Sequence, residues 1–215
     1  MAGFFVSQEG LDNIRQGVQE KRSVLVDNVR NLCTNINDYM QTNWASPSAA
    51  AFLAETKEVI SSIDNAINVA WKDIESVVNT AAVAYAAEER ASINPIVTDG
   101  FENIGAGIFT GTFTPNLPGG AVGIPDTTTP SEVASHLQSE FNAVKSNYEQ
   151  FMSDIRGVIE SSGSFDQNAL AGIGNAAANF STTLANAISE VEQSCVTRTN
   201  AEATSRENIT SSFSA

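Results

Sequence analysis

Apolar residues recur every three or four positions along four long stretches of this sequence. This spacing places them on one face of an α-helix, so each stretch predicts a long amphipathic helix. Aromatic residues make up only 7% of the chain, which also favours helices over a sandwich or barrel of strands. The four series comprise Leu11, Ile14, Val18, Leu25, Val29, Leu32, Ile36 and Tyr39; Phe52, Val59, Ile63, Ala66, Ala70, Ile74, Val77, Ala81 and Tyr85; Val133, Leu137, Phe141, Val144, Tyr148, Phe151, Ile155 and Val158; and Leu170, Ile173, Ala177, Phe180, Leu184, Ile188, Val191 and Cys195.

Turn and cap signals divide the four helices into two hairpins. Ser46 can cap the second helix, and Pro47 suits its first position. Thr129, followed three residues later by Glu132, forms a capping box before the third helix. A polar, glycine-containing stretch at 160–168 separates the third helix from the fourth. The sequence therefore predicts an all-α fold of two long helical hairpins packed as a four-helix bundle.

A segment rich in glycine and proline joins the two hairpins. Five of the six prolines and seven of the fourteen glycines lie between Pro95 and Pro130, so we expect no helix there. The expected organisation is a first hairpin at 1–94, a linker at 95–130 and a second hairpin at 131–215. A simple up-and-down bundle needs only about 2 to 8 residues between helices. The longer linker predicts antiparallel hairpins, with Trp44 at one end, Phe165 at the other, and a linker that runs back along the bundle.

Charge and hydropathy exclude several classes of partner. The chain carries 11 Lys and Arg against 25 Asp and Glu, a formal net charge of −14, so we expect no nucleic-acid partner. No run reaches the roughly 20 apolar residues of a membrane span, and we expect no membrane insertion. The N-terminal MAGFFVSQEG lacks the basic and apolar regions of a secretory signal peptide. The expected location is the cytoplasm, or outside the cell by a route that does not read such a signal.

No group of residues indicates catalysis. His136 is the only histidine, and no cysteine lies near it in the sequence, which argues against a metal site or a catalytic triad. We expect this side chain on the solvated surface. The stretch GAGIFTG at 105–111 resembles a phosphate-binding loop, but it lacks GK[ST] and a following helix. We therefore expect no enzyme, no cofactor and no metal.

The turn between the first two helices carries the most specific motif of the chain. A helix, a tight turn with Trp44, a small residue two positions later, alanines and then Phe52 resemble the WXG family of small type VII (ESX) secretion proteins. Ser46 stands where that family has glycine. In the family, one helical hairpin pairs with a second hairpin into a four-helix bundle. The resemblance implies that the second hairpin of this chain takes the place of a separate partner chain.

The family also carries a Tyr-x-x-x-Asp/Glu export signal near the end of its second helix, and Tyr85 to Glu89 match this pattern. The resemblance implies that Trp44, Ser46, Tyr85 and Glu89 serve secretion or recognition. We expect Trp44 and the Tyr85 to Glu89 pattern to contribute more to export than to stability. Plainer interpretations remain open, in which Trp44 is an aromatic staple that closes the hairpin and Tyr85 completes its apolar series.

The resemblance implies a non-enzymatic protein of type VII (ESX) secretion, either a secreted substrate, cytoplasmic before export, or a folded partner of such a substrate. Its partners would be the secretion machinery or an effector protein, and self-association remains open. The alternative is a helical membrane-active protein of the pore-forming type. In that case the apolar, glycine-containing residues 101–125 would insert into lipid as a tongue.

The two cysteines, Cys33 and Cys195, are too few for a disulfide scaffold or a zinc cluster. Cys33 lies 11 residues before Trp44, and Cys195 lies 30 residues after Phe165. At about 1.5 Å per helical residue, antiparallel hairpins would place the two thiols at similar heights in the bundle. They could form a disulfide or simply lie close together. Cys33 stands one position off its apolar series, so we expect proximity rather than a bond.

Overall fold

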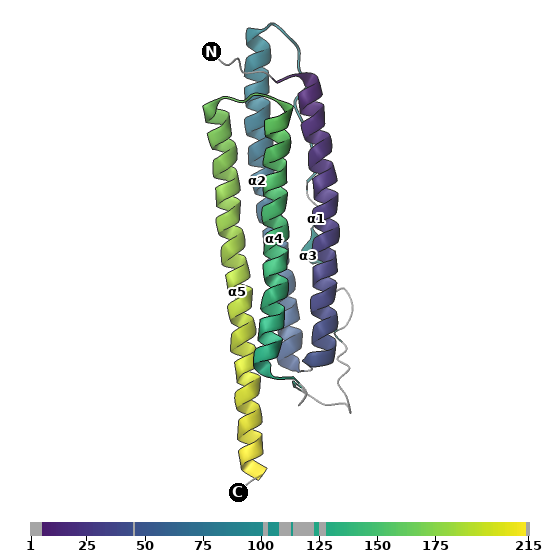
Figure 1. The fold of residues 1–215 in the computed structure, drawn as a ribbon, viewed down its shortest axis with the longest axis vertical. Helices are drawn as coiled ribbons and strands as arrows, with labels where there is room; N and C mark the ends of the chain where they lie inside the picture. The colour runs from purple at the N-terminus through teal and green to yellow at the C-terminus, as the bar shows by residue number, and fades with distance from the viewer. Residues whose placement is uncertain are drawn as a thin grey trace. The chain divides into compact units, whose positions relative to one another are not determined.

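The computed structural model describes residues 6–44, 46–100, 103–107, 113, 123–124 and 128–213. Four long helices pack as a bundle (Figure 1), which confirms the predicted all-α fold of two hairpins. The first hairpin comprises α1 and α2, and the second comprises α4 and α5. A single helical turn, α3, lies in the linker between them. The bounds are α1 Gln8–Asn43, α2 Pro47–Glu88, α3 Ile104–Gly107, α4 Pro130–Ser162 and α5 Gln167–Phe213.

Each long helix begins at a side-chain cap. The predicted capping box is confirmed, because the Glu132 carboxylate accepts a hydrogen bond from the Thr129 backbone N–H at 2.7 Å and Thr129 Oγ1 accepts one from the Glu132 N–H at 3.2 Å. Ser46 Oγ accepts a bond from the backbone N–H three residues later at 3.2 Å, as predicted for α2. Ser7 and Asp166 cap α1 and α5 in the same way, at 2.9 and 2.7 Å. These caps fix where the helices start.

The C-terminal end of α2 closes with a backbone motif that needs a left-handed residue. The N–H of Ala91 donates to the carbonyl of Ala86 at 2.8 Å, and the N–H of Arg90 donates to the carbonyl of Ala87 at 3.4 Å. This pair of bonds is a Schellman motif. Arg90 has a φ of 55°, a conformation in which glycine is favoured and an L side chain is strained. The helix therefore stops at a strained hinge.

The chain divides into two compact units, and each draws on all four long helices. Unit 1 comprises Met1–Asn28, Ile63–Glu102 and Ser146–Leu184, and unit 2 comprises Val29–Ser62, Asn103–Lys145 and Ala185–Ala215. This division cuts across the hairpins. The expected boundaries at 94 and 130 follow the hairpins instead, and they stay a prediction.

In unit 1, α1 packs against α4 with very little space between the backbones. A Cβ added at Gly10 would overlap the carbonyl oxygen of Ser162, and one added at Gly17 would lie 2.8 Å from a Val158 methyl. The first turn of α1 thus lies beside the last turn of α4. This contact requires the two hairpins to run in opposite directions, which confirms the antiparallel prediction.

Unit 2 gives the same topology independently. Thr128, just before α4, donates a hydrogen bond to Asn43 at the end of α1 at 3.2 Å. The α1–α2 turn therefore lies beside the start of α4, whereas parallel hairpins would place it beside the α4–α5 turn. Phe165, in that other turn, belongs to unit 1 and is buried.

The apolar series of α4 matches the buried face almost throughout, but several members of the series of α1, α2 and α5 stand one residue away from a buried position. Cys33 and Met40 are buried in the core, at 1% and 0% exposure, while Leu32 and Tyr39 are half-buried. The placement of Cys33 off the apolar face was therefore wrong. The predicted series of α1 advances about 3.5 residues per step, whereas a straight helix turns every 3.6 residues, so the buried face of α1 drifts away from the series along the helix.

The linker contains a helical turn that the sequence analysis did not predict. α3 begins where Asn103 Oδ1 accepts a hydrogen bond from the Ala106 N–H at 2.7 Å. Gly105 lies so close to Ser61 on α2 that an added Cβ would sit 2.5 Å from its backbone nitrogen. The expectation that no helix forms in the linker was wrong, because a capped turn of small residues can pack directly on a helix. Most of the proposed tongue, residues 101–125, lies outside the described residues.

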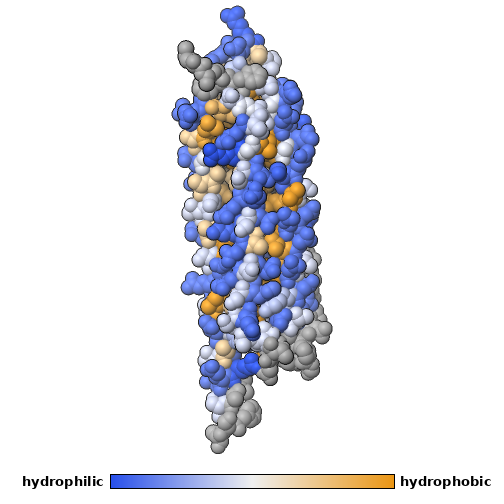
Figure 2. Space-filling view, viewed as in Figure 1, coloured by the Kyte–Doolittle hydropathy of each residue, from blue (hydrophilic) through white to orange (hydrophobic). Residues whose placement is uncertain are grey.

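The surface is largely hydrophilic on the face drawn in Figure 2, where hydrophobic residues appear as scattered small areas. Large apolar side chains that are exposed in the described ranges are isolated valines, such as Val69 at 62% and Val97 at 78%. Scattered valines of this kind are normal on a protein surface. Among the helices described, none combines the length and apolar character required of a membrane span.

The glycine contact between α1 and α4 gives a direct test of the packing in unit 1. We expect Gly10→Ala to lower the free energy of unfolding by about 1 to 3 kcal/mol, because the new methyl group forces the backbones apart. Gly157 is the matched control, since it lies inside α4 with open space around its Cα. Gly157→Ala should raise stability by about 0.5 to 1 kcal/mol through helix propensity. Urea denaturation measures both, and equal effects of the two substitutions would contradict the packing.

Candidate functional site

The α1–α2 turn is built around a buried tryptophan. Trp44 is fully buried, and its ring centroid lies 5.7 Å from that of Phe52 on α2. Phe52 in turn meets Phe141 of α4 edge-on at 6.0 Å. The three rings join the turn to both hairpins within unit 2. Trp44 is therefore the aromatic staple that one of the two sequence interpretations described.

The polar atoms of the same turn converge on one carboxylate of α5. The indole N–H of Trp44 donates to Glu202 at 3.2 Å, and the Ser46 hydroxyl donates to the same carboxylate oxygen at 2.5 Å. A glycine at position 46 could offer no such hydroxyl. The serine that departs from the Trp-x-Gly pattern thus both caps α2 and binds the second hairpin.

Burial changes the expectation for Trp44. Replacing a buried tryptophan with alanine costs about 3 to 5 kcal/mol, so this residue stabilises the fold strongly. The expectation that Trp44 contributes more to export than to stability stays a prediction, and the burial of the side chain adds a large contribution to stability. A secretion defect in Trp44→Ala would not distinguish a lost signal from a lost fold.

The Tyr85 to Glu89 pattern lies at the end of α2. Tyr85 is half-buried, and Glu88 and Glu89 are exposed. Val77 of α2 packs against Gly172 of α5, and α5 begins five residues earlier, at Gln167. The last turns of α2, from about residue 83, therefore extend past the start of α5 by roughly 9 Å (Figure 1). The Tyr85 to Glu89 pattern therefore lies on a part of α2 that α5 does not cover.

Residues 94–99, here called the strap, follow this end of α2 and run back along it in unit 1. Asn79 of α2 pairs with the backbone of Ile96, accepting from its N–H and donating to its carbonyl, both at 2.7 Å. One turn closer to the N-terminus of α2, the Glu75 carboxylate accepts hydrogen bonds from the Thr98 N–H, at 3.0 Å, and from the Thr98 hydroxyl. Side chains of α2 therefore replace the neighbouring strand that an extended segment would normally have.

The Thr98 hydroxyl also ties the strap to a tryptophan. It accepts a hydrogen bond from the indole N–H of Trp71 at 2.6 Å, while Lys72 donates to the Thr98 carbonyl at 2.8 Å. Trp71 is 1% exposed, so it belongs to the core. We call this set, Trp71, Lys72, Glu75 and Asn79, the clasp.

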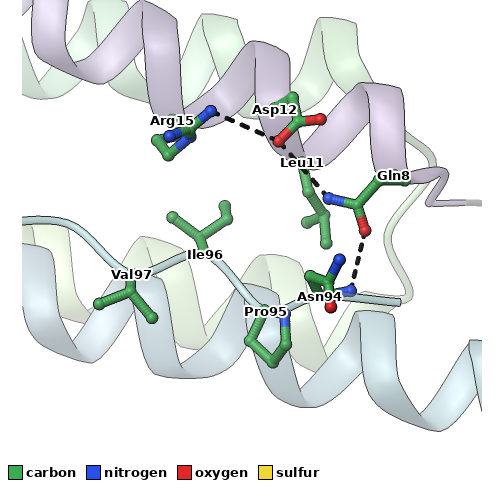
Figure 3. Close-up of a pocket in the computed structure, with 8 residues that line it drawn as sticks. All are labelled: Gln8, Leu11, Asp12, Arg15, Asn94, Pro95, Ile96 and Val97. Atoms are coloured by element: carbon green, nitrogen blue, oxygen red, sulfur yellow. Dashed lines mark hydrogen bonds and ion pairs between the residues drawn. The ribbon is translucent and has the colours of Figure 1, made fainter. Parts of the chain in front are cut away.

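On its other side the strap meets α1. Gln8 accepts a hydrogen bond from the Asn94 N–H at 2.8 Å, and Arg22 donates to the Asp99 carbonyl at 3.5 Å. Arg15 lies midway between Gln8 and Arg22 in sequence and forms an ion pair with Asp12 at 3.7 Å. A pocket of about 380 Å³ lies beside the strap at this position (Figure 3). Leu11, Ile96 and Val97 supply its apolar wall. The contacts that hold the strap are therefore polar at both edges.

Sequence reasoning missed the clasp entirely. Glu75 and Asn79 stand among polar residues that a helical pattern assigns to the surface, and Thr98 stands in a proline- and glycine-rich segment. The same holds for Asp64, which is 1% exposed and accepts a hydrogen bond from the buried Tyr148 hydroxyl at 2.7 Å. The one sequence feature that could have indicated the clasp is the spacing of Glu75 and Asn79, which are four residues apart and therefore lie on the same helix face.

Cys33 and Cys195 are both buried and are not joined by a disulfide, so the bridge that the sequence allowed is not formed. The hydrogen bond between Trp44 and Glu202 sets the register of α1 and α5 in unit 2. Cys33 lies 11 residues before Trp44 on α1, and Cys195 lies seven residues before Glu202 on α5. The two cysteines therefore differ by four residues in their position along the helix axes, which corresponds to about 6 Å. Their proximity stays a prediction.

His136 stacks on Tyr39, with ring centroids 3.7 Å apart. Its side chain is 41% exposed and lies 3.8 Å from Glu140. Burial, then the negative charges of Glu132 and Cys195, raise the pKa of Tyr39. Within the described ranges, no three His, Cys, Asp or Glu side chains gather as metal ligands would. The ring pair serves as an interhelical contact between α1 and α4.

No family model, curated protein or solved structure matches the chain. The WXG resemblance of the Trp44 turn and of the Tyr85 to Glu89 pattern thus stays a prediction from the residues themselves.

The shared carboxylate of Glu202 can be tested by removing it. Glu202→Ala leaves the buried indole N–H of Trp44 without a partner, and we expect the free energy of unfolding to fall by about 1 to 3 kcal/mol. Glu190→Ala is the control, because this glutamate is exposed on the same helix, and we expect a change within about 0.5 kcal/mol. Denaturant titrations followed by tryptophan fluorescence report both. Similar values for the two variants would disprove the role of Glu202.

The buried thiols give a prediction about reactivity and pH. Burial, with a smaller contribution from Glu192, raises the pKa of Cys195 to about 12. We expect the native protein to react with a thiol reagent at pH 8 only as fast as it unfolds, and two thiols to react at once in denaturant. As pH rises from about 9 to 12, the unfolded thiol ionises first, so stability falls across this window. Fast labelling of a native thiol at pH 8 would contradict this expectation.

Proposed function

We propose that this chain is a non-enzymatic protein of type VII (ESX) secretion, a secreted substrate or a folded partner of one, built as an intramolecular pair of WXG-like hairpins. The observation that carries this proposal is the tie between the Trp44 turn and α5, in which Glu202 binds both Trp44 and Ser46. The second hairpin covers a turn that would otherwise need a partner chain.

Further support comes from the geometry of both units. The first hairpin packs against the second through backbone contacts in unit 1 and through the aromatic rings and Glu202 in unit 2. Such a chain would travel as a folded pair without a separate subunit. Its partners would then be the secretion machinery or an effector protein.

The accessible end of α2 is where we place recognition by the secretion machinery. Tyr85 is half-buried, so part of its side chain is exposed to solvent. Glu89, four residues later, lies at the end of the helix with its side chain exposed. A docking protein could read the aromatic ring and the carboxylate together without opening the bundle.

Two adjacent glutamates make this proposal testable. In a host with a type VII system, we expect Glu89→Ala and Tyr85→Ala to reduce secretion of the full chain at least about tenfold, the loss that corresponds to about 1.4 kcal/mol of binding. Glu88→Ala is the matched control, because Glu88 is equally exposed but lies outside the Tyr-x-x-x-Glu spacing. Secretion is measured by immunoblotting of the medium against the cell pellet.

Thermal melts of the purified variants separate export from folding. The two glutamate variants should melt within a few degrees of the parent, because surface substitutions usually change stability by less than about 0.5 kcal/mol. Equal secretion of the Glu88 and Glu89 variants would contradict the proposed signal. Failure to secrete the parent chain at all would contradict the proposed role as a secreted substrate.

A further inference from the structure

The hinge at the end of α2 is the one strained backbone position in the described residues other than glycine. Arg90 adopts a φ of 55°, and its conformation lets the chain turn back from α2 onto the strap. A residue with a side chain is destabilised there relative to glycine. Straightening the hinge would remove this strain, but the strap would then leave its own α2.

The clasp recognises the strap through features that any copy of this segment carries. Asn79 binds only backbone atoms of Ile96, and Glu75 and Lys72 bind backbone atoms of Thr98. Two side chains add specificity, since Ile96 is 3% and Thr98 is 7% exposed. The occupant is therefore an extended Ile-x-Thr segment, and a second copy of the chain supplies an identical one.

The position of the hinge allows a second copy to approach. The last turns of α2 extend past the start of α5, as the contact between Val77 and Gly172 indicates. Five residues, 89–93, separate α2 from the first strap contact at Asn94, and they can span about 16 Å when extended. A strained connection of this kind, next to an element that binds by local contacts, favours exchange between identical chains.

We propose that two copies of this chain can exchange everything after the hinge at 89–93, so that the clasp of each copy holds the strap of the other. The first hairpin of one copy then packs against the second hairpin of its partner through the contacts already described. The exchanged form differs from the monomer mainly at the hinge, where both strained Arg90 residues relax. This inference does not depend on the proposed secretion role.

Hinge substitutions test the exchange in the full chain. The protein is unfolded, refolded at high concentration and analysed by size exclusion with light scattering. We expect Arg90→Gly, which tolerates the left-handed conformation, to lower the dimer association constant about tenfold or more, because each dimer relieves two hinges. Arg90→Val should raise it by a similar factor. Ser92→Gly is the control, since Ser92 has no positive φ, and its effect should be much smaller.

A complementation experiment distinguishes exchange from side-by-side association. One chain carries Glu75→Ala, which damages the clasp, and the other carries Thr98→Val, which removes the strap hydroxyl that donates to Glu75. Because the two substitutions remove the same hydrogen bond, the contact that carries both loses less than the sum of the two separate losses. In an exchanged heterodimer, the intact clasp of the second chain meets the intact strap of the first. Refolded mixtures should therefore contain more heterodimer than the statistical half, as measured by native mass spectrometry.

These experiments decide whether the exchange occurs, and their results do not depend on whether the chain is secreted. Dimers that depend on the hinge and show heterodimer enrichment support the exchange. If the dimer association constant does not change with the hinge substitutions and heterodimers form only at the statistical level, the dimers associate side by side without exchange. This result would overturn the proposal. A protein that stays monomeric in all variants, Arg90→Val included, while circular dichroism shows native helix content, would overturn it as well.

Discussion

Each hairpin of this chain has an apolar face that it cannot bury by itself, and this constraint explains most of the structure. A pair of helices leaves much of its apolar surface in water, whereas four helices in antiparallel pairs can enclose it. The second hairpin meets this need in both units, through Ser162 and Val158 beside the glycines of α1 and through Phe141 beside Phe52. Fusing both hairpins in one chain makes the partner always present.

Joining antiparallel hairpins requires a long crossover, and the crossover brings exposed backbone onto the bundle. A segment with few apolar residues gains little from burial, so hydrogen bonds must hold it. The clasp supplies these bonds from α2, and no buried polar side-chain atom among the described residues lacks a partner. This arrangement explains why Glu75 and Thr98 are buried although their types usually are not.

Periodicity and caps predicted most of the fold from sequence, and the linker length predicted its topology. The Thr129 capping box and the proline at position 47 marked helix starts within a residue. Prediction failed where distant segments decide the outcome. The burial of Cys33 depends on how far a straight helix drifts over many turns, and α3 and the clasp depend on surfaces far away in sequence. The role of Glu202 at the Trp44 turn was invisible for the same reason, since 156 residues separate it from Ser46.

The most direct test of this account asks whether the first hairpin needs the second. Residues 1–94 are produced alone and analysed by circular dichroism and analytical ultracentrifugation, then mixed with residues 128–215. The account predicts that the first fragment alone either lacks stable helix or self-associates, and that mixing restores a 1:1 complex with cooperative unfolding. A fragment 1–94 that is fully helical, monomeric and as stable as the whole chain would contradict the claim that the second hairpin serves as its partner.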